Sequence, residues 1–182
     1  RTAVCQDIHF TVPVNLTFPD NAVRDGLLAD QSVIYQDQAI LKLPPSYSKD
    51  GPPTRLVYLA HGAGGGVTSN AWFLNNYALK DSLLNNGYAV FDVNGGPSIE
   101  NMGGSWVVQA AIKAYHHILQ HYNVHPLIFV TGLSMGGCSS TNFVYKHSNI
   151  VLAHTLFSPV LDLHEQAWQN PWLKTTRKAI AA

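Results

Sequence analysis

The stretch Gly132-Leu133-Ser134-Met135-Gly136 lies between two segments with different structural preferences. The apolar run at 126–131 before it is typical of a buried strand, and residues 138–146 after it predict a helix. A strand that leads directly into a helix must turn sharply at Ser134. Glycines two residues before and two residues after the serine leave room for the closely approaching backbones. The stretch therefore predicts a strand–turn–helix unit with the serine hydroxyl at the tip of the turn.

The helix predicted after this turn would begin beside the serine. Its free N–H groups and partial positive charge would then lie next to the serine hydroxyl. This is the context in which a serine acts as a nucleophile, so Ser134 is our candidate catalytic nucleophile. The alternative is a glycine- and serine-rich turn without chemistry, because G-x-S-x-G also occurs by chance. We favour the nucleophile because both flanking segments have the required type.

Length and composition limit the classes of protein to consider. The chain has 182 residues, 46% of them hydrophobic and 12% charged, which predicts a single domain over residues 1–182 with a well-buried core. Eleven basic residues balance eleven acidic ones without a basic cluster, so we expect no nucleic-acid partner. No apolar run reaches the length of a membrane span. Cys5 and Cys138 are predicted to be free thiols and not a disulfide.

Predicted strands alternate with predicted helices from residue 55 onward. The strands are expected at 55–60, 88–93, 127–131 and 150–157, and the helices at 71–86, 105–122, 138–146, 163–168 and 173–182. Residues 8–17 predict an outer strand with Pro13 at an edge, and residues 38–43 a second strand followed by a hairpin-type loop at 46–53. The alternation predicts an α/β fold, a mostly parallel sheet with helices on both faces.

Glycine-rich segments follow three of these strands, at His61–Gly66, at Asn94–Gly104 and at Ser134. Sites in mostly parallel sheets lie at the carboxyl ends of the strands, so the three segments should converge on one edge. The first segment lacks both the ending of a phosphate-binding P-loop and the dinucleotide-binding spacing. We predict instead that N–H groups of Gly62 or Ala63, together with that of Met135, stabilise the negative oxygen formed when a serine attacks a carbonyl.

Two of these motifs resemble those of a known superfamily. His61-Gly62-Ala63-Gly64-Gly65 resembles the HGGG-type oxyanion motif of the α/β-hydrolases, and the stretch around Ser134 resembles their nucleophile elbow. The likeness covers roughly residues 38–162. It is greatest to the esterase group of polyhydroxyalkanoate depolymerases and feruloyl esterases, and esterase modules of phage tail proteins are similar. The resemblance implies an α/β-hydrolase fold and serine-dependent hydrolysis of a small-molecule or polymer-borne ester, with neither metal nor organic cofactor.

A nucleophilic serine needs a histidine base and a carboxylate that orients it. The resemblance implies that both follow the serine, after a seventh and an eighth strand, whereas we predict no strand beyond the sixth. Asp162 is the candidate acid, because some lipases carry the acid just past the sixth strand; a helix N-cap is the alternative that we favour. His164 is too close to Asp162 to complete a triad without backbone strain. We therefore predict that the domain is incomplete at its C-terminus and that a missing segment or a second chain supplies acid and histidine.

Other polar residues have simpler interpretations. His147 ends the helix after the serine, and His154 is predicted to be a core histidine within an apolar strand. His117 and His121, four residues apart on one helix, could face a metal together, but no third ligand is evident and a solvated helix face is favoured. Asp92 at the end of a strand either caps a loop or contacts substrate.

The sequence is also compatible with a second class of function. The same motifs could belong to a binding or structural module that uses a hydrolase scaffold within a larger assembly and has no turnover. The serine and both glycine-rich segments favour an enzyme. The absence of a convincing base favours the module.

Overall fold

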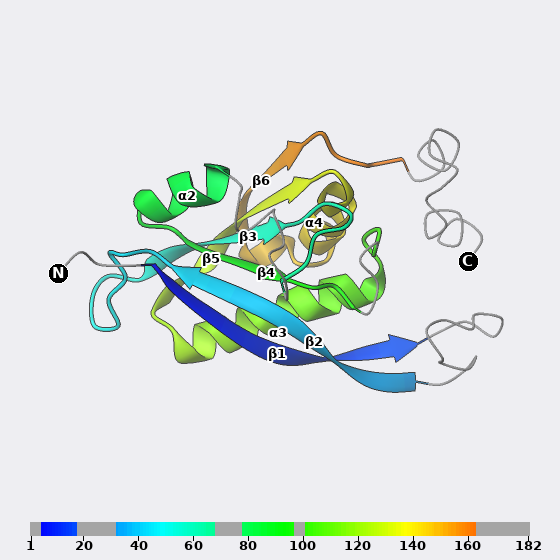
Figure 1. The fold of residues 1–182 in the computed structure, drawn as a ribbon, viewed down its shortest axis with the longest axis horizontal. Helices are drawn as coiled ribbons and strands as arrows, with labels where there is room; N and C mark the ends of the chain where they lie inside the picture. Colours follow the sequence, from blue (N-terminus) through cyan, green and yellow to red (C-terminus); the bar gives the residue numbers. More distant parts are fainter. Residues whose placement is uncertain (1–4, 18–31, 68–77, 97–100, 163–182) are drawn as a thin grey trace.

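A computed structural model describes residues 5–17, 32–67, 78–96 and 101–162 of the chain. Its six strands form one sheet in the spatial order β1-β2-β4-β3-β5-β6 (Figure 1). Strands β3, β4, β5 and β6 run parallel, and β1 and β2 pair antiparallel. The described elements are β1 (Gln6–Thr17), β2 (Ser32–Leu43), β3 (Thr54–Ala60), α2 (Ala78–Asn85), β4 (Ala89–Val93), α3 (Ser105–His121), β5 (Val124–Leu133), α4 (Met135–Lys146), η1 (Ser148–Ile150) and β6 (Val151–Phe157).

Helices cover both faces of the sheet because successive strand residues point to opposite sides. Within β3, Leu56 and Tyr58 belong to the hydrophobic cluster that also holds apolar residues of α3 and Phe143 of α4. Val57 and Leu59 belong to a second cluster with Leu84 of α2. Both sides of β3 are therefore buried, as its continuous apolar sequence predicts. The predicted mostly parallel sheet with helices on both faces is confirmed.

Strands β1 and β2 form a long antiparallel pair at one side of the sheet (Figure 1). Their register runs without interruption from Gln6 opposite Leu43 to Thr17 opposite Ser32. β1 is the edge strand, as predicted, and helix α3 packs against it, with the Lys113 ammonium donating to the carbonyl of Pro13 at 2.6 Å. β2 begins at Ser32, earlier than its predicted start at residue 38. Its pairing with β1 continues beyond the apolar residues on which the prediction was based.

One predicted connection is wrong. Residues 46–53 were expected to form a hairpin-type loop, but β4 lies between β2 and β3 in the sheet, so the segment leads to a strand that does not pair with β2. The turn itself is present, with the N–H of Tyr47 donating to the carbonyl of Pro44 at 3.0 Å. Serine, proline and glycine specify a turn locally, whereas the choice of the pairing partner is made by the rest of the sheet.

The observed helix boundaries differ from the predicted ones, and the first difference concerns the serine. Helix α4 begins at Met135, directly after the turn and earlier than residue 138. Helix α2 ends before Gly87, whose φ of 81° confirms it as a left-handed cap, and residues 71–77 lie outside the described part. The helices predicted at 163–168 and 173–182 also lie outside it. Within the described ranges, no helix combines the length and hydropathy that a bilayer crossing requires.

Candidate active site

Ser134 occupies the sharp turn between β5 and α4. Its backbone has φ 52° and ψ −118°, a left-handed conformation that side-chain-bearing residues rarely adopt. Such strain costs roughly 1–3 kcal/mol and persists only where the surrounding structure enforces it. The side chain is half-buried, and no hydrogen bond joins its hydroxyl to another described residue. The predicted strand–turn–helix unit is therefore present, with the serine at its tip.

The glycines on either side of Ser134 are required by close backbone packing. A Cβ atom at Gly136 would collide with the backbone carbonyl oxygens of Ala60 and His61. A Cβ atom at Gly132 would collide with the backbone of Gly136. Helix α4 can thus start directly against the end of β3 only because Gly136 has no side chain. This contact brings the serine turn and the loop that begins at His61 into one place.

The loop after β3 lies against Ser134. A Cβ atom built on Gly62 would be 3.5 Å from the Cβ of Ser134, an ordinary contact distance. The loop closes on itself through the N–H of Gly65, which donates to the carbonyl of Gly62 at 3.1 Å, while Ala63 is exposed. Gly62, Ser134 and Met135 are therefore neighbours. The roles of Gly62, Ala63 and Met135 as donors to an oxyanion stay predictions.

A buried ion pair holds the start of this loop. Nδ1 of His61 lies 2.8 Å from a carboxylate oxygen of Asp92, and both side chains are buried. The other oxygen of Asp92 accepts the N–H of Val93 at 2.8 Å. Asp92 therefore fastens the loop after β3 to the end of β4. At 1% exposure it has no access to a substrate.

Asp37 is a second buried carboxylate, and we did not predict it from the sequence. Its oxygens accept the N–H groups of Gly95 and Gly96 at 2.9 and 3.0 Å, and it is fully buried. Both glycines have positive φ, 79° and 94°, so the loop after β4 turns tightly around the carboxylate. One signal could have revealed it. Asp37 has the same period-two position in β2 as the buried Ala39, so it faces the core.

Several solved structures share this fold. No protein-family model and no curated protein matches the chain. Among solved structures, an S-formylglutathione hydrolase from Agrobacterium tumefaciens superimposes with a TM-score of 0.61 at 14% identity, covering 76% of this chain and 58% of that one. FphF, a fluorophosphonate-binding serine hydrolase of Staphylococcus aureus, has a TM-score of 0.62 at 14% identity, covering 90% and 61%. A ferulic acid esterase has a TM-score of 0.57 at 19% identity, covering 85% and 59%.

The chain has the α/β-hydrolase fold. It spans about three fifths of the length of these three structures, 58%, 61% and 59% respectively. Identities of 14–19% show a shared fold and do not assign a substrate.

Histidines after Ser134 in this α/β-hydrolase fold have other contacts. His154 on β6 is half-buried and lies 3.0 Å from the Ser140 hydroxyl. His147 follows α4 and packs on Phe143, with ring centroids 5.1 Å apart. His164 lies outside the described residues. Within the described part, the α/β-hydrolase fold thus brings no histidine to the serine hydroxyl.

Two further predictions concern the acid and the metal. Asp162 is exposed and lies beyond the end of β6, so its assignment as the acid stays a prediction. His117 is half-buried against Phe10, with ring centroids 4.4 Å apart, and it also stacks on His121 at 4.2 Å. The described residues contain no group of three or more His, Cys, Asp or Glu that could hold a metal ion.

The charges around His61 shift its titration. Burial alone lowers the pKa of His61, but the carboxylates of Asp92 and Asp37 outweigh this and raise it above its ordinary value. Burial raises the pKa of Asp92, which the charge of His61 partly offsets. Burial also raises the pKa of Asp37, against the effect of the amide donors. In this α/β-hydrolase fold, the raised pKa of His61 therefore favours its protonated form beside Asp92, behind the loop of Gly62.

This cluster predicts how stability depends on pH. The pKa of His61 is raised on folding, so its contribution to the free energy of unfolding is complete below about pH 6.5 and is lost as pH rises through the folded pKa. We expect this free energy, measured by urea unfolding, to fall as the pH rises above about 6.5. The lowered pKa values of His117, His147 and His154 act below this window.

The variant Asp92→Asn is the control for this pH prediction. It keeps the shape of the side chain and removes the main charge that raises the pKa of His61. The fall in stability above about pH 6.5 should flatten in this variant. A wild-type stability that stays constant or rises over the same window would contradict the assignment.

Proposed function

We propose that the chain carries the nucleophile of a serine hydrolase that cleaves carboxylic esters. The observation that supports it best is the strained turn at Ser134, with Gly62 packed against the serine. A strained serine between a strand and a helix, beside a glycine-rich loop, has the geometry of a nucleophile with an oxyanion site. The names of the three neighbours, an S-formylglutathione hydrolase, a ferulic acid esterase and a serine hydrolase, support the same class.

The proposed reaction has two stages. The Ser134 hydroxyl attacks the acyl carbon while a base takes its proton, and the N–H groups of Met135 and of Gly62 or Ala63 stabilise the negative oxygen. The C–O bond to the alcohol then breaks, and the alcohol leaves with the proton from the base. Water attacks the acyl-enzyme in the same way and releases the acid with the serine hydroxyl restored.

The base and its acid are proposed to come from elsewhere. His61 is paired with Asp92 inside the protein, and His154 contacts Ser140. We propose that a segment beyond this sequence, or a second chain, places a histidine and a carboxylate beside Ser134. On this proposal the 182-residue chain alone has little turnover, whereas the full-length protein is active.

Hydrolysis of p-nitrophenyl acetate by the full-length protein tests the proposal. This ester acylates serine nucleophiles quickly and its alcohol absorbs visible light. We expect release of p-nitrophenol above the rate in buffer, with a first-turnover burst whose size is proportional to the concentration of folded protein. Release no faster than in buffer, from protein shown to be folded, would contradict the proposal and favour a binding or structural module.

A further inference from the structure

The segment Phe157–Val160, which we call the brace, holds the backbone of Ser134 from the side of β6. The N–H of Ser134 donates to the carbonyl of Phe157 at 3.1 Å. The N–H of Val160 donates to the carbonyl of Ser134 at 2.9 Å. Between these two bonds the brace has its own left-handed residue, Ser158, with φ 42°. Both backbone polar groups of the strained serine are therefore engaged by the brace.

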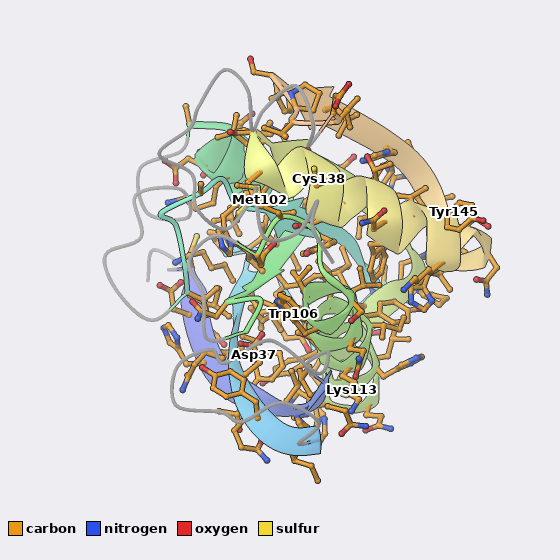
Figure 2. All side chains as sticks on the ribbon, turned by 90° about the vertical axis from the view of Figure 1, so that its right-hand side faces the viewer. Asp37, Met102, Trp106, Lys113, Cys138 and Tyr145 are labelled. Atoms are coloured by element: carbon orange, nitrogen blue, oxygen red, sulfur yellow. The ribbon has the colours of Figure 1, made fainter. Side chains whose placement is uncertain are left out.

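The brace is in turn attached to the first turns of α4. A Cβ atom on Gly137 would come within 2.5 Å of the Cβ of Pro159, so the brace packs directly on the helix backbone. The thiol of Cys138 donates to the carbonyl of Val160 at 2.7 Å. Figure 2 shows Cys138 near the start of α4, beside the loop that carries Met102. The next residue of that loop, Gly103, leaves no space behind Cys138, since a Cβ there would be 2.9 Å from the Cβ of Cys138.

We propose that Cys138 is a positioning residue that keeps Ser134 in its strained conformation by anchoring Val160 of the brace. This rests on the proposed function for its catalytic consequence, because a nucleophile gains from being fixed. Val160 is the residue that links the two contacts: its carbonyl accepts from the thiol, and its N–H donates to the carbonyl of Ser134. When the thiol donor is lost, the brace can move away from α4 and release the serine backbone.

The chemistry of the contact identifies the variants that test it. Burial raises the pKa of the Cys138 thiol to about 11, so the thiol keeps its donor proton at neutral pH. Cys138→Ala removes the donor. Cys138→Ser keeps one, and about 2.7 Å is the usual separation for a hydroxyl donating to a carbonyl. Cys5→Ala, at the other and only half-buried cysteine, is the matched control.

Amide hydrogen exchange and ester hydrolysis are measured on the full-length protein and these variants. In Cys138→Ala, we expect the amides of Ser134 and Val160 to exchange about tenfold faster, while the core amide of Leu59 is unchanged. We expect kcat for p-nitrophenyl acetate to fall by about tenfold with KM within about twofold, because a nucleophile displaced by less than about 1 Å loses less than about a hundredfold. Cys138→Ser and Cys5→Ala should match the wild type in both measurements.

The two measurements separate the possible failures. Unchanged exchange of Ser134 and Val160 in Cys138→Ala would overturn the proposal, whatever the activity. Faster exchange with unchanged kcat would overturn the positioning role, because the brace would then be loose without effect on the nucleophile. Equal losses in Cys138→Ala and Cys138→Ser would also overturn it, since the donor would not be the cause. A wild type without hydrolysis refutes the proposed function, and the exchange rates still decide whether the thiol holds the brace.

Discussion

Ser134→Ala is expected to lower kcat of the full-length protein for p-nitrophenyl acetate by a factor of about 10⁴ or more. The substitution removes the oxygen that forms the bond to the acyl carbon, so the acyl-enzyme cannot form. The left-handed backbone is equally strained with serine and with alanine, so the free energy of unfolding should change by less than about 1 kcal/mol. Steady-state rates and urea unfolding of the same preparation measure both effects.

Ser148→Ala is the matched control for this variant. Ser148 is an exposed serine in η1, after helix α4 and away from the turn. Its replacement should leave kcat and stability unchanged. If Ser134→Ala kept a tenth or more of the wild-type kcat, about 1.4 kcal/mol or less of transition-state stabilisation would be lost, too little for a nucleophile.

Gly136→Ala is expected to destabilise the protein by about 3 kcal/mol or more, at the upper end of the usual cost of overpacking. The new methyl group would collide with the carbonyl oxygens of Ala60 and His61, which belong to the backbone and cannot rotate away. Relief requires α4 to move away from the end of β3. Since this contact also joins the serine turn to the loop of Gly62, ester hydrolysis should be lost in the fraction that still folds.

Gly87→Ala shows what a glycine substitution costs without a collision. Gly87 has φ 81°, and its nearest contact would be the flexible hydroxyl of Ser46 at 3.3 Å. We expect a loss of about 1–2 kcal/mol from the left-handed backbone alone, and no change in kcat. Equal losses for Gly136→Ala and Gly87→Ala would contradict the packing argument.

The sequence was sufficient to predict the sheet and the place of the serine because the signals involved are local. The apolar run before Ser134, the glycines around it and the helix after it each specify their own backbone. The rule that parallel strands present their carboxyl ends together then places the loop of His61 beside the turn. The turn at Ser134 and the loop of His61 do lie side by side, as the contact between Gly62 and Ser134 confirms.

Features that depend on distant pairs were not predicted. The Asp37 carboxylate accepts the N–H groups of Gly95 and Gly96, which are distant from it in the sequence. These hydrogen bonds can be inferred only when β2 is placed next to β4. The brace is similar, because the carbonyl of Phe157 and the N–H of Val160 acquire their function only when β6 lies beside β5. The spacing of residues along one strand carries no information about such partners.

Labelling with a fluorophosphonate probe tests the central claim most directly. The probe forms an O–P bond with an activated serine and releases fluoride, and peptide mass spectrometry identifies the modified residue. We predict that the folded full-length protein takes up one probe molecule per chain, on the peptide that contains Ser134. A modification on another residue, or no modification of folded protein, would contradict the account.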